Sequence, residues 1–268
     1  MTRAARVALL LASPLPAAAA QAPAPRPAEF HYTPVQLDCA SFQERSRGRL
    51  EAQTGTRQRR EMLTRDAVWR VRARPGPAAI SVEAWYDSLA LTRASPEGTL
   101  RPDTDGLLGG RYRGTLTPAG DYTAEARPFV PDEVAEVAEL GGAMEDLLPR
   151  LPRVALAVGE RWADSTGLEL RRLADSTAGR RVIQRLALRW RGETDHATVR
   201  GDTTSIAARQ VTVEDGRVDW SPAAGLLRRI RHIVVETSLP AGGPIRQPLR
   251  SRLEQDVSLV RVGGRCGR

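Results

Sequence analysis

Apolar and polar residues alternate with period two along most of the chain from about residue 42 onward. The clearest case is 181–190, where Val182, Leu186, Leu188 and Trp190 alternate with Arg181, Arg185 and Arg189. Further runs of this kind lie at 67–73, 80–91, 112–116, 230–239 and 253–262. Period two is typical of strands with one buried face. We therefore expect a mainly β (α+β) fold, with a curved antiparallel sheet of many strands whose outer face carries arginine.

Turn-forming residues separate several of these runs. The clusters are Pro118–Asp121, Glu214–Gly216 and Ala241–Pro244. Proline, glycine and aspartate in such clusters favour tight turns. We expect a turn between strands at each of the three.

The segment 131–149 departs from the strand pattern. Val134, Val137, Met144 and Leu148 recur at helical spacing, after a proline at 131. Proline suits the first position of a helix, and the following Asp132 and Glu133 match the positive end of the helix dipole. We expect a midchain helical link that packs these apolar residues onto the sheet, with Gly141–Gly142 dividing it into two short helices.

The first twenty residues have the form of a secretory signal peptide. A short basic start (1–6) precedes an apolar run (7–20), with Ala18 and Ala20 placed for cleavage before Gln21. The apolar run is too short to span a bilayer. We expect a periplasmic or secreted protein without a transmembrane segment in its mature chain, and a disordered Pro/Ala-rich leader over 21–38.

The remaining residues, 39–268, are expected to form a single β-rich domain. Its two parts, 42–128 and 158–264, look weakly alike: each has a strand followed by a Ser/Thr-Pro-Ala turn, at 112–120 and 216–225. Two similar halves joined by the helical link 131–149 are therefore an open alternative within the one domain.

The chain has two cysteines, Cys39 and Cys266, one near each end of the expected mature chain. An even number of cysteines in an oxidising compartment suggests a disulfide. Neither cysteine has the spacing of a metal or redox site. We expect a structural Cys39–Cys266 bridge, with two free thiols as the alternative.

Composition narrows the candidate chemistry. All 40 basic residues are arginine, and the formal net charge is +8. Without lysine, Schiff-base and P-loop lysine chemistry is excluded. Because 32 acidic residues are interspersed and aromatics are few, we do not expect a nucleic-acid partner. The three histidines lack metal-ligand spacing, so no metal or cofactor is expected, and no catalytic residues are assigned.

Five tryptophans fall on expected strands: Trp69, Trp85, Trp162, Trp190 and Trp220. Large aromatic residues suit a half-buried pleated surface, so core packing is the simpler interpretation. If the sheet curves into an open cup, the same residues are the candidates for lining a ligand site.

The stretch LPRLPRVALAVGERW, from Leu148 to Trp162, resembles the LP…VxVG(D/E)xW segment of secreted bacterial β-rich families of unknown function. Glu160 stands where those families usually have aspartate. Their proposed relatives are the periplasmic lipoprotein-carrier proteins, which fold as a curved antiparallel sheet around helices with an apolar interior. The resemblance thus implies a fold more than an activity.

Three functional hypotheses follow. The first is an exported, non-enzymatic periplasmic protein that binds an apolar or lipid-like ligand. The second is a structural or interaction module of the cell envelope whose partner is an envelope protein. The third is an enzyme, with hydrolase as the class to consider.

Overall fold

The computed structural model describes residues 26–138, 140, 142–179, 181–198, 205–241 and 246–264. One 12-stranded antiparallel sheet dominates them, which confirms the expected mainly β fold. Its strands are β1 (Ser41–Thr54), β2 (Arg57–Pro75), β3 (Ile80–Ser95), β4 (Gly98–Leu100), β5 (Tyr112–Leu116), β6 (Tyr122–Ala126), β7 (Arg161–Ala163), β8 (Leu168–Ala178), β9 (Arg181–Thr198), β10 (Ser205–Ser221), β11 (Gly225–Leu239) and β12 (Leu249–Gly263). The helical elements among these residues are α1 (Pro34–Leu37), the 3-10 turn η1 (Asp105–Leu107), α2 (Asp132–Ala135) and α3 (Ala143–Leu147).

The strand order is β6-β5-β3-β2-β1-β12-β11-β10-β9-β8-β7, with β4 paired to β3 off this path. The chain therefore meanders outward from β1 to β6, and then returns from the opposite edge, β7, inward to β12. The first and last strands pair at the centre of the sheet, with Ser41 opposite Gly263. The edges β6 and β7 do not pair, and the midchain segment 127–160 connects them.

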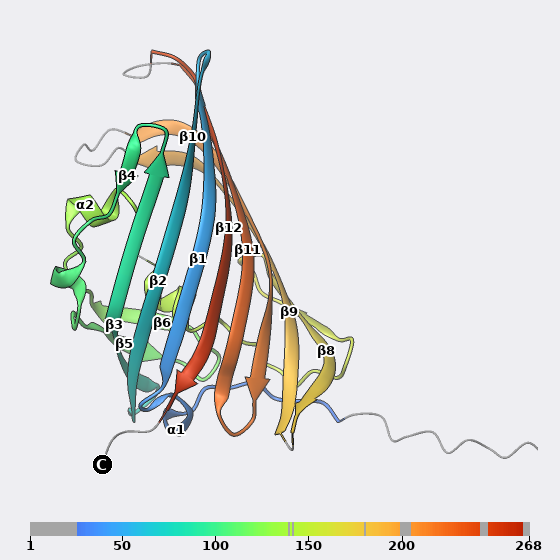
Figure 1. Ribbon diagram of the computed structural model, residues 1–268. Coiled ribbons are helices and arrows are strands. Elements are labelled where there is room, and N and C mark those ends of the chain that lie inside the picture. Colours follow the sequence, from blue (N-terminus) through green and yellow to red (C-terminus); the bar gives the residue numbers. More distant parts are fainter. Residues whose placement is uncertain are drawn as a thin grey trace, which may run out of the picture.

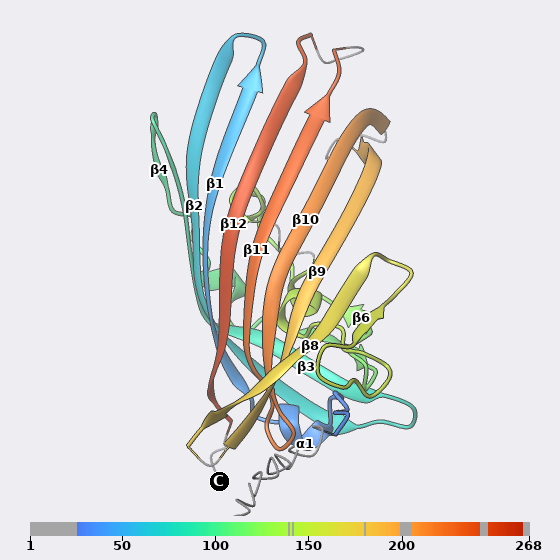
Figure 2. The same cartoon turned by 90° about the vertical axis from the view of Figure 1, so that its right-hand side faces the viewer.

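The sheet curves strongly, and the midchain helices lie on its concave side (Figures 1 and 2). We call this side the inner face. The main hydrophobic core occupies one end of it, where Phe42 and Trp69 from the sheet belong to the same buried cluster as Met144 and Leu147 of α3. Because alternate strand residues point inward, the period-two pattern of the sequence directly supplies this core.

The helical link has the predicted apolar face but less helix than predicted. Val134, Val137, Met144 and Leu148 are all buried in the core. The helices α2 and α3 have only four and five residues, and the expected division near Gly142 is present. Burial against the sheet, rather than helix propensity, therefore fixes this segment.

The predicted leader over 21–38 is corrected in its described part. From Arg26 onward the chain packs onto the core: Ala28 pairs with Leu156, and Phe30 and Tyr32 are buried. The Tyr32 hydroxyl donates a hydrogen bond to the Pro149 carbonyl at 3.0 Å. Aromatic residues inside the Pro/Ala-rich stretch therefore order it. The predicted signal peptide lies outside the described residues.

One predicted turn is also wrong. Pro118–Asp121 does turn between β5 and β6, but Glu214–Gly216 lies in the middle of β10. A Cβ atom on Gly216 would lie 2.5 Å from the Ile230 carbonyl oxygen, so this glycine permits close approach of β11 rather than a turn. Most of the third expected turn, at Ala241–Pro244, lies outside the described residues.

The predicted disulfide remains a prediction, because Cys266 lies outside the described residues. Cys39 lies just before β1, and the end of β12 lies beside the start of β1. This pairing brings both ends of the domain into one sheet, as the bridge would require. β12 is a central strand of the sheet, between β1 and β11. Within the described part of the chain, every helix falls short of what crossing a bilayer requires.

Candidate functional site

A belt of six charged residues crosses the inner face where the main core ends. It consists of Glu44, Arg65, Asp146, Glu214, Arg229 and Arg231. Five of them come from strands, at inward-facing positions, and Asp146 comes from α3. All five strand residues are buried. Three arginines face three carboxylates, so the charged belt is neutral as a whole.

The contacts within the charged belt are close. Arg231 Nη1 donates to Asp146 Oδ1 at 2.6 Å and lies 3.6 Å from Glu214 Oε2. Arg229 Nη2 donates to Glu214 Oε1 at 3.0 Å, and its Nη1 donates to the Asp146 carbonyl at 2.7 Å. On the other side of the sheet centre, Glu44 pairs with Arg65. Buried charges are tolerated when paired and hydrogen-bonded in this way.

These pairings keep two belt residues ionised. Burial favours a raised pKa for Asp146, but Arg231 outweighs it and the pKa lies below its usual value. Burial likewise favours a lowered pKa for Arg231, but Asp146 and Glu214 outweigh it and the pKa is raised. Both shifts lead away from neutral pH, so these groups are fixed charges rather than proton donors or acceptors.

A cavity of about 460 Å³ lies between the charged belt, α3 and the strands beyond it. Its floor contains Glu214, Arg229 and Arg231, and its apolar wall contains Leu168, Leu188 and Trp190. Asp121 and Tyr122 lie at the rim on the other side. The cavity therefore collects residues from both ends of the open sheet, from beside β6 and from β8 and β9.

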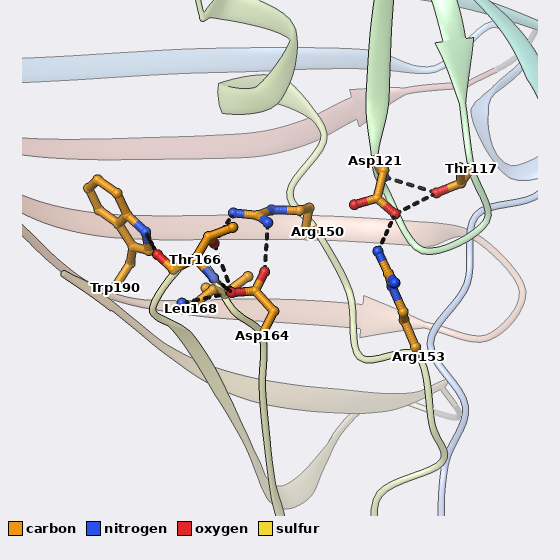
Figure 3. A network of polar contacts seen from close by, with 8 residues as sticks. All are labelled: Thr117, Asp121, Arg150, Arg153, Asp164, Thr166, Leu168 and Trp190. Carbon is orange, nitrogen blue, oxygen red and sulfur yellow. Dashed lines mark hydrogen bonds and ion pairs between the residues drawn. The ribbon is translucent and has the colours of Figure 1, made fainter. Parts of the chain in front are cut away.

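Trp190 is held rigidly in the cavity wall. Its indole Nε1 donates to the Thr166 carbonyl at 2.9 Å (Figure 3). Leu168 and Glu214 are its direct cross-strand neighbours. A Cβ atom on Gly192 would lie 2.4 Å from the indole ring, so the ring lies over this glycine. The side chain is nevertheless only half-buried. The wall thus offers a fixed aromatic surface.

Two ion pairs order the loops at the rim (Figure 3). Arg150 Nη1 donates to Asp164 Oδ2 at 2.6 Å, and Arg153 Nη2 donates to Asp121 Oδ2 at 3.0 Å. Burial acts to raise the pKa of Asp164, but hydrogen bonds from Thr166 and other groups lower it overall. The link between α3 and β7 is therefore anchored on both sides of the cavity.

Beyond the charged belt, the inner face is apolar but not covered. We call the five half-buried aliphatic residues there the aliphatic patch: Leu50, Leu63, Ile233, Val235 and Leu253. They are neighbours across β2, β1, β12 and β11, and Leu253 is directly opposite both Leu50 and Val235. Ile233 lies opposite Glu214 of the cavity floor. The patch belongs to neither buried hydrophobic cluster, and its side chains remain partly accessible. Through Ile233 it adjoins the cavity.

A second hollow, of about 720 Å³, lies mainly over outward-facing residues of β9–β12. Val211, Val213 and Val234 contribute apolar surface, and Arg209 and Arg252 stand near them. Both arginines are already paired, with Glu193 and Glu236. This outer hollow is larger than the inner cavity, but none of the charged-belt residues lines it.

The structure distributes the five predicted tryptophans differently. Trp69 and Trp220 are fully buried in the main core, and Trp162 is half-buried between the two hydrophobic clusters. Trp85 lies on the other side of the sheet, where the Arg111 guanidinium is 3.5 Å from its ring centroid. Trp190 lines the inner cavity. For the described residues, no cluster of three or more histidine, cysteine or acidic side chains could hold a metal ion.

Sequence reasoning missed the charged belt. The signal was present in 225–239, where Arg229 and Arg231 are in phase with the apolar Ile233 and Val235 rather than with the outward-facing residues. Glu44 is likewise in phase with Phe42. Because arginine marks the outer face along the rest of the chain, these inward arginines were not distinguished.

The comparisons with known proteins add little. No protein-family model and no curated protein matches the chain. One similar solved structure is described as the crystal structure of a DUF1329 family protein from Desulfovibrio piger. It shares 11% sequence identity over 87% of this chain and 89% of that chain, with a TM-score of 0.20. A likeness of this size carries no argument, so function has to be inferred from the geometry of the chain itself.

Proposed function

We propose that this chain is an exported, non-enzymatic binding protein that holds an apolar, lipid-like ligand on the inner face of its sheet. Export to the periplasm or beyond rests on the signal-peptide pattern of residues 1–20. The observation that carries the binding role is the inner cavity, whose wall is apolar, whose floor is charged, and whose floor residue Glu214 lies opposite Ile233 of the aliphatic patch.

The arrangement suits an amphipathic molecule. Trp190, backed by the buried Leu168 and Leu188, offers apolar surface, while the ion-paired floor offers fixed hydrogen-bonding groups that orient a polar end. The aliphatic patch then accommodates a chain that leaves the cavity beside Ile233. Covering these half-buried side chains would contribute roughly 25 cal/mol for each Å² of apolar surface removed from water.

The fixed charges of the floor favour binding over catalysis. Acid–base catalysis works best with groups whose pKa lies near the working pH. The pKa shifts of Asp146 and Arg231 lead in the opposite direction. Asp146 and Arg231 therefore hold their charges in place and can orient a ligand.

The resemblance to lipoprotein-carrier relatives belongs to this proposal as well. The segment that carries it, 148–162, links α3 to β7 and buries Leu148, Leu151 and Leu156. Glu160 Oε2 accepts a hydrogen bond from the Ala157 backbone at 2.6 Å, which stabilises the turn before β7. In this chain the acidic residue at this position thus serves the turn.

The test is native mass spectrometry of protein purified from the periplasm of its own host. We expect a co-purified lipid-like molecule. Two neighbouring residues of β11 give matched variants: Val235→Glu places a charge in the aliphatic patch, and Val234→Glu places one in the outer hollow. We expect only Val235→Glu to lose the ligand. Loss in Val234→Glu alone would assign the ligand to the outer hollow, and absence of any ligand in the parent protein would overturn the proposal.

A further inference from the structure

The charged groups of the inner cavity do not cancel completely. Its lining includes four carboxylates and three arginines: Asp121, Glu145, Asp146, Glu214, Arg150, Arg229 and Arg231. Each of the three arginines is paired with a carboxylate, and Asp121 is paired with Arg153. The Glu145 side chain forms no ion pair with any described residue. The cavity therefore carries one uncompensated negative charge.

Glu145 lies at the rim, near aromatic surface. It is exposed at the first turn of α3 and is close enough to Tyr122 for their electrostatic interaction to matter. Burial, followed by the charge of Glu145, raises the pKa of Tyr122 to about 12, while the positive charge of Arg127 acts to lower this pKa. The Tyr122 hydroxyl donates to the Arg113 carbonyl at 2.8 Å, so this ring too is held in place.

Trp190 supplies an aromatic ring over which a cation can bind. Its Nε1 is already bonded to Thr166, so the indole has no donor left for a ligand, and the half-buried ring presents its remaining exposed aromatic surface to the cavity that it lines. Cations bind over tryptophan rings with about 0.5–2 kcal/mol. An anion would find no unpaired cation in this lining, because each arginine there is already neutralised.

We propose that the polar part of the ligand carries an ammonium group, bound in the inner cavity between the Trp190 ring and the Glu145 carboxylate. This inference rests on the proposed function, since it names the chemistry of the ligand at the same site. The apolar part of such an amphiphile extends from Trp190 past Glu214 to Ile233 and the aliphatic patch. Selectivity for an ammonium group over a neutral or anionic group comes from the Glu145 carboxylate and the Trp190 ring together.

The experiment measures the binding of three amphiphiles with one chain length to the mature protein by calorimetry: decyltrimethylammonium, decyl maltoside and decyl sulfate. Each is used below its micelle concentration. We expect the ammonium amphiphile to bind about fivefold or more tightly than either of the others. Glu145→Gln should remove most of this preference, and Glu133→Gln, an exposed glutamate of α2 outside the cavity lining, should leave it unchanged. Trp190→Leu keeps an apolar wall and should weaken the ammonium amphiphile more than the maltoside.

The outcomes separate the inference from the function. Equal binding of all three amphiphiles, or a preference for the sulfate, would overturn the ammonium proposal and leave the binding function standing. A preference that survives Glu145→Gln would also overturn it. If none of the three binds at all, the proposed function itself fails, and the inference fails with it.

Discussion

The pairing of Glu44 with Arg65 gives the sharpest test of the charged belt as a structural unit. Both side chains are almost fully buried, with 6% and 10% of their surfaces exposed. Glu44 Oε2 also accepts a hydrogen bond from the Trp69 indole at 2.9 Å. Replacing Arg65 by methionine keeps a similar apolar stem and removes the charge. It leaves a buried carboxylate with the indole as its remaining partner.

The expected cost is large. Breaking a buried ion pair by removing one partner typically costs about 3–5 kcal/mol. In a domain of this size, 1 kcal/mol lowers the melting temperature by about 2–4 °C, so Arg65→Met should melt roughly 6–20 °C below the parent. Urea unfolding followed by circular dichroism measures the free energy directly. Arg47→Met, an exposed arginine of β1, is the matched control and should change the unfolding free energy by less than about 0.5 kcal/mol.

A double variant tests the cause of the loss. Glu44→Gln keeps an oxygen for the Trp69 indole and removes the buried negative charge. Combined with Arg65→Met it leaves no unpaired charge, so the double variant should be more stable than Arg65→Met alone. An Arg65→Met protein that melts within about 2 °C of the parent, or a double variant that is less stable than the single one, would refute the reasoning.

Three further predictions concern other contacts. Because the pKa of Asp146 is lowered in the folded protein, its contribution to stability is complete above the usual value of 3.8 and is lost as the pH falls through the folded-state pKa. As the pH falls from about 5 to about 3, the unfolding free energy of Asp146→Asn should therefore decrease less than that of the parent. Equal decreases in the two proteins would contradict this. Tyr32→Phe removes the hydrogen bond to the buried Pro149 carbonyl and should cost about 1–2 kcal/mol by urea unfolding; an unchanged midpoint would show that this bond contributes nothing. Non-reducing peptide mapping of exported protein should show Cys39 crosslinked to Cys266, and two freely alkylated thiols would refute the bridge.

Much of the fold could be predicted from the sequence because its determinants are local. Alternating residues in 181–190 and 230–239 define strands with one buried face, and the structure has β9 and β11 there. The spacing of Val134, Val137, Met144 and Leu148 likewise identified the face that packs onto the core. The extent of helix was overestimated, since tertiary packing rather than propensity orders this segment.

The cavity could not be predicted, because it depends on distant segments. It brings Tyr122 of β6 together with Trp190 of β9, and these strands are far apart in sequence and unpaired in the sheet. The sequence marked Trp190 only as one of five similar tryptophans. Its position beside Glu214 follows from the register between β9 and β10. Its ring lies over Gly192, where a larger side chain would clash with it.

Photo-crosslinking tests the central claim most directly. A lysophospholipid with a diazirine in its acyl chain would be bound to the mature protein, irradiated, and mapped residue by residue with tandem mass spectrometry. A ligand on the inner face predicts adducts on the aliphatic patch, at Leu50, Val235 or Leu253. Adducts confined to Val211 and Val213 of the outer hollow, with none on the patch, would contradict it.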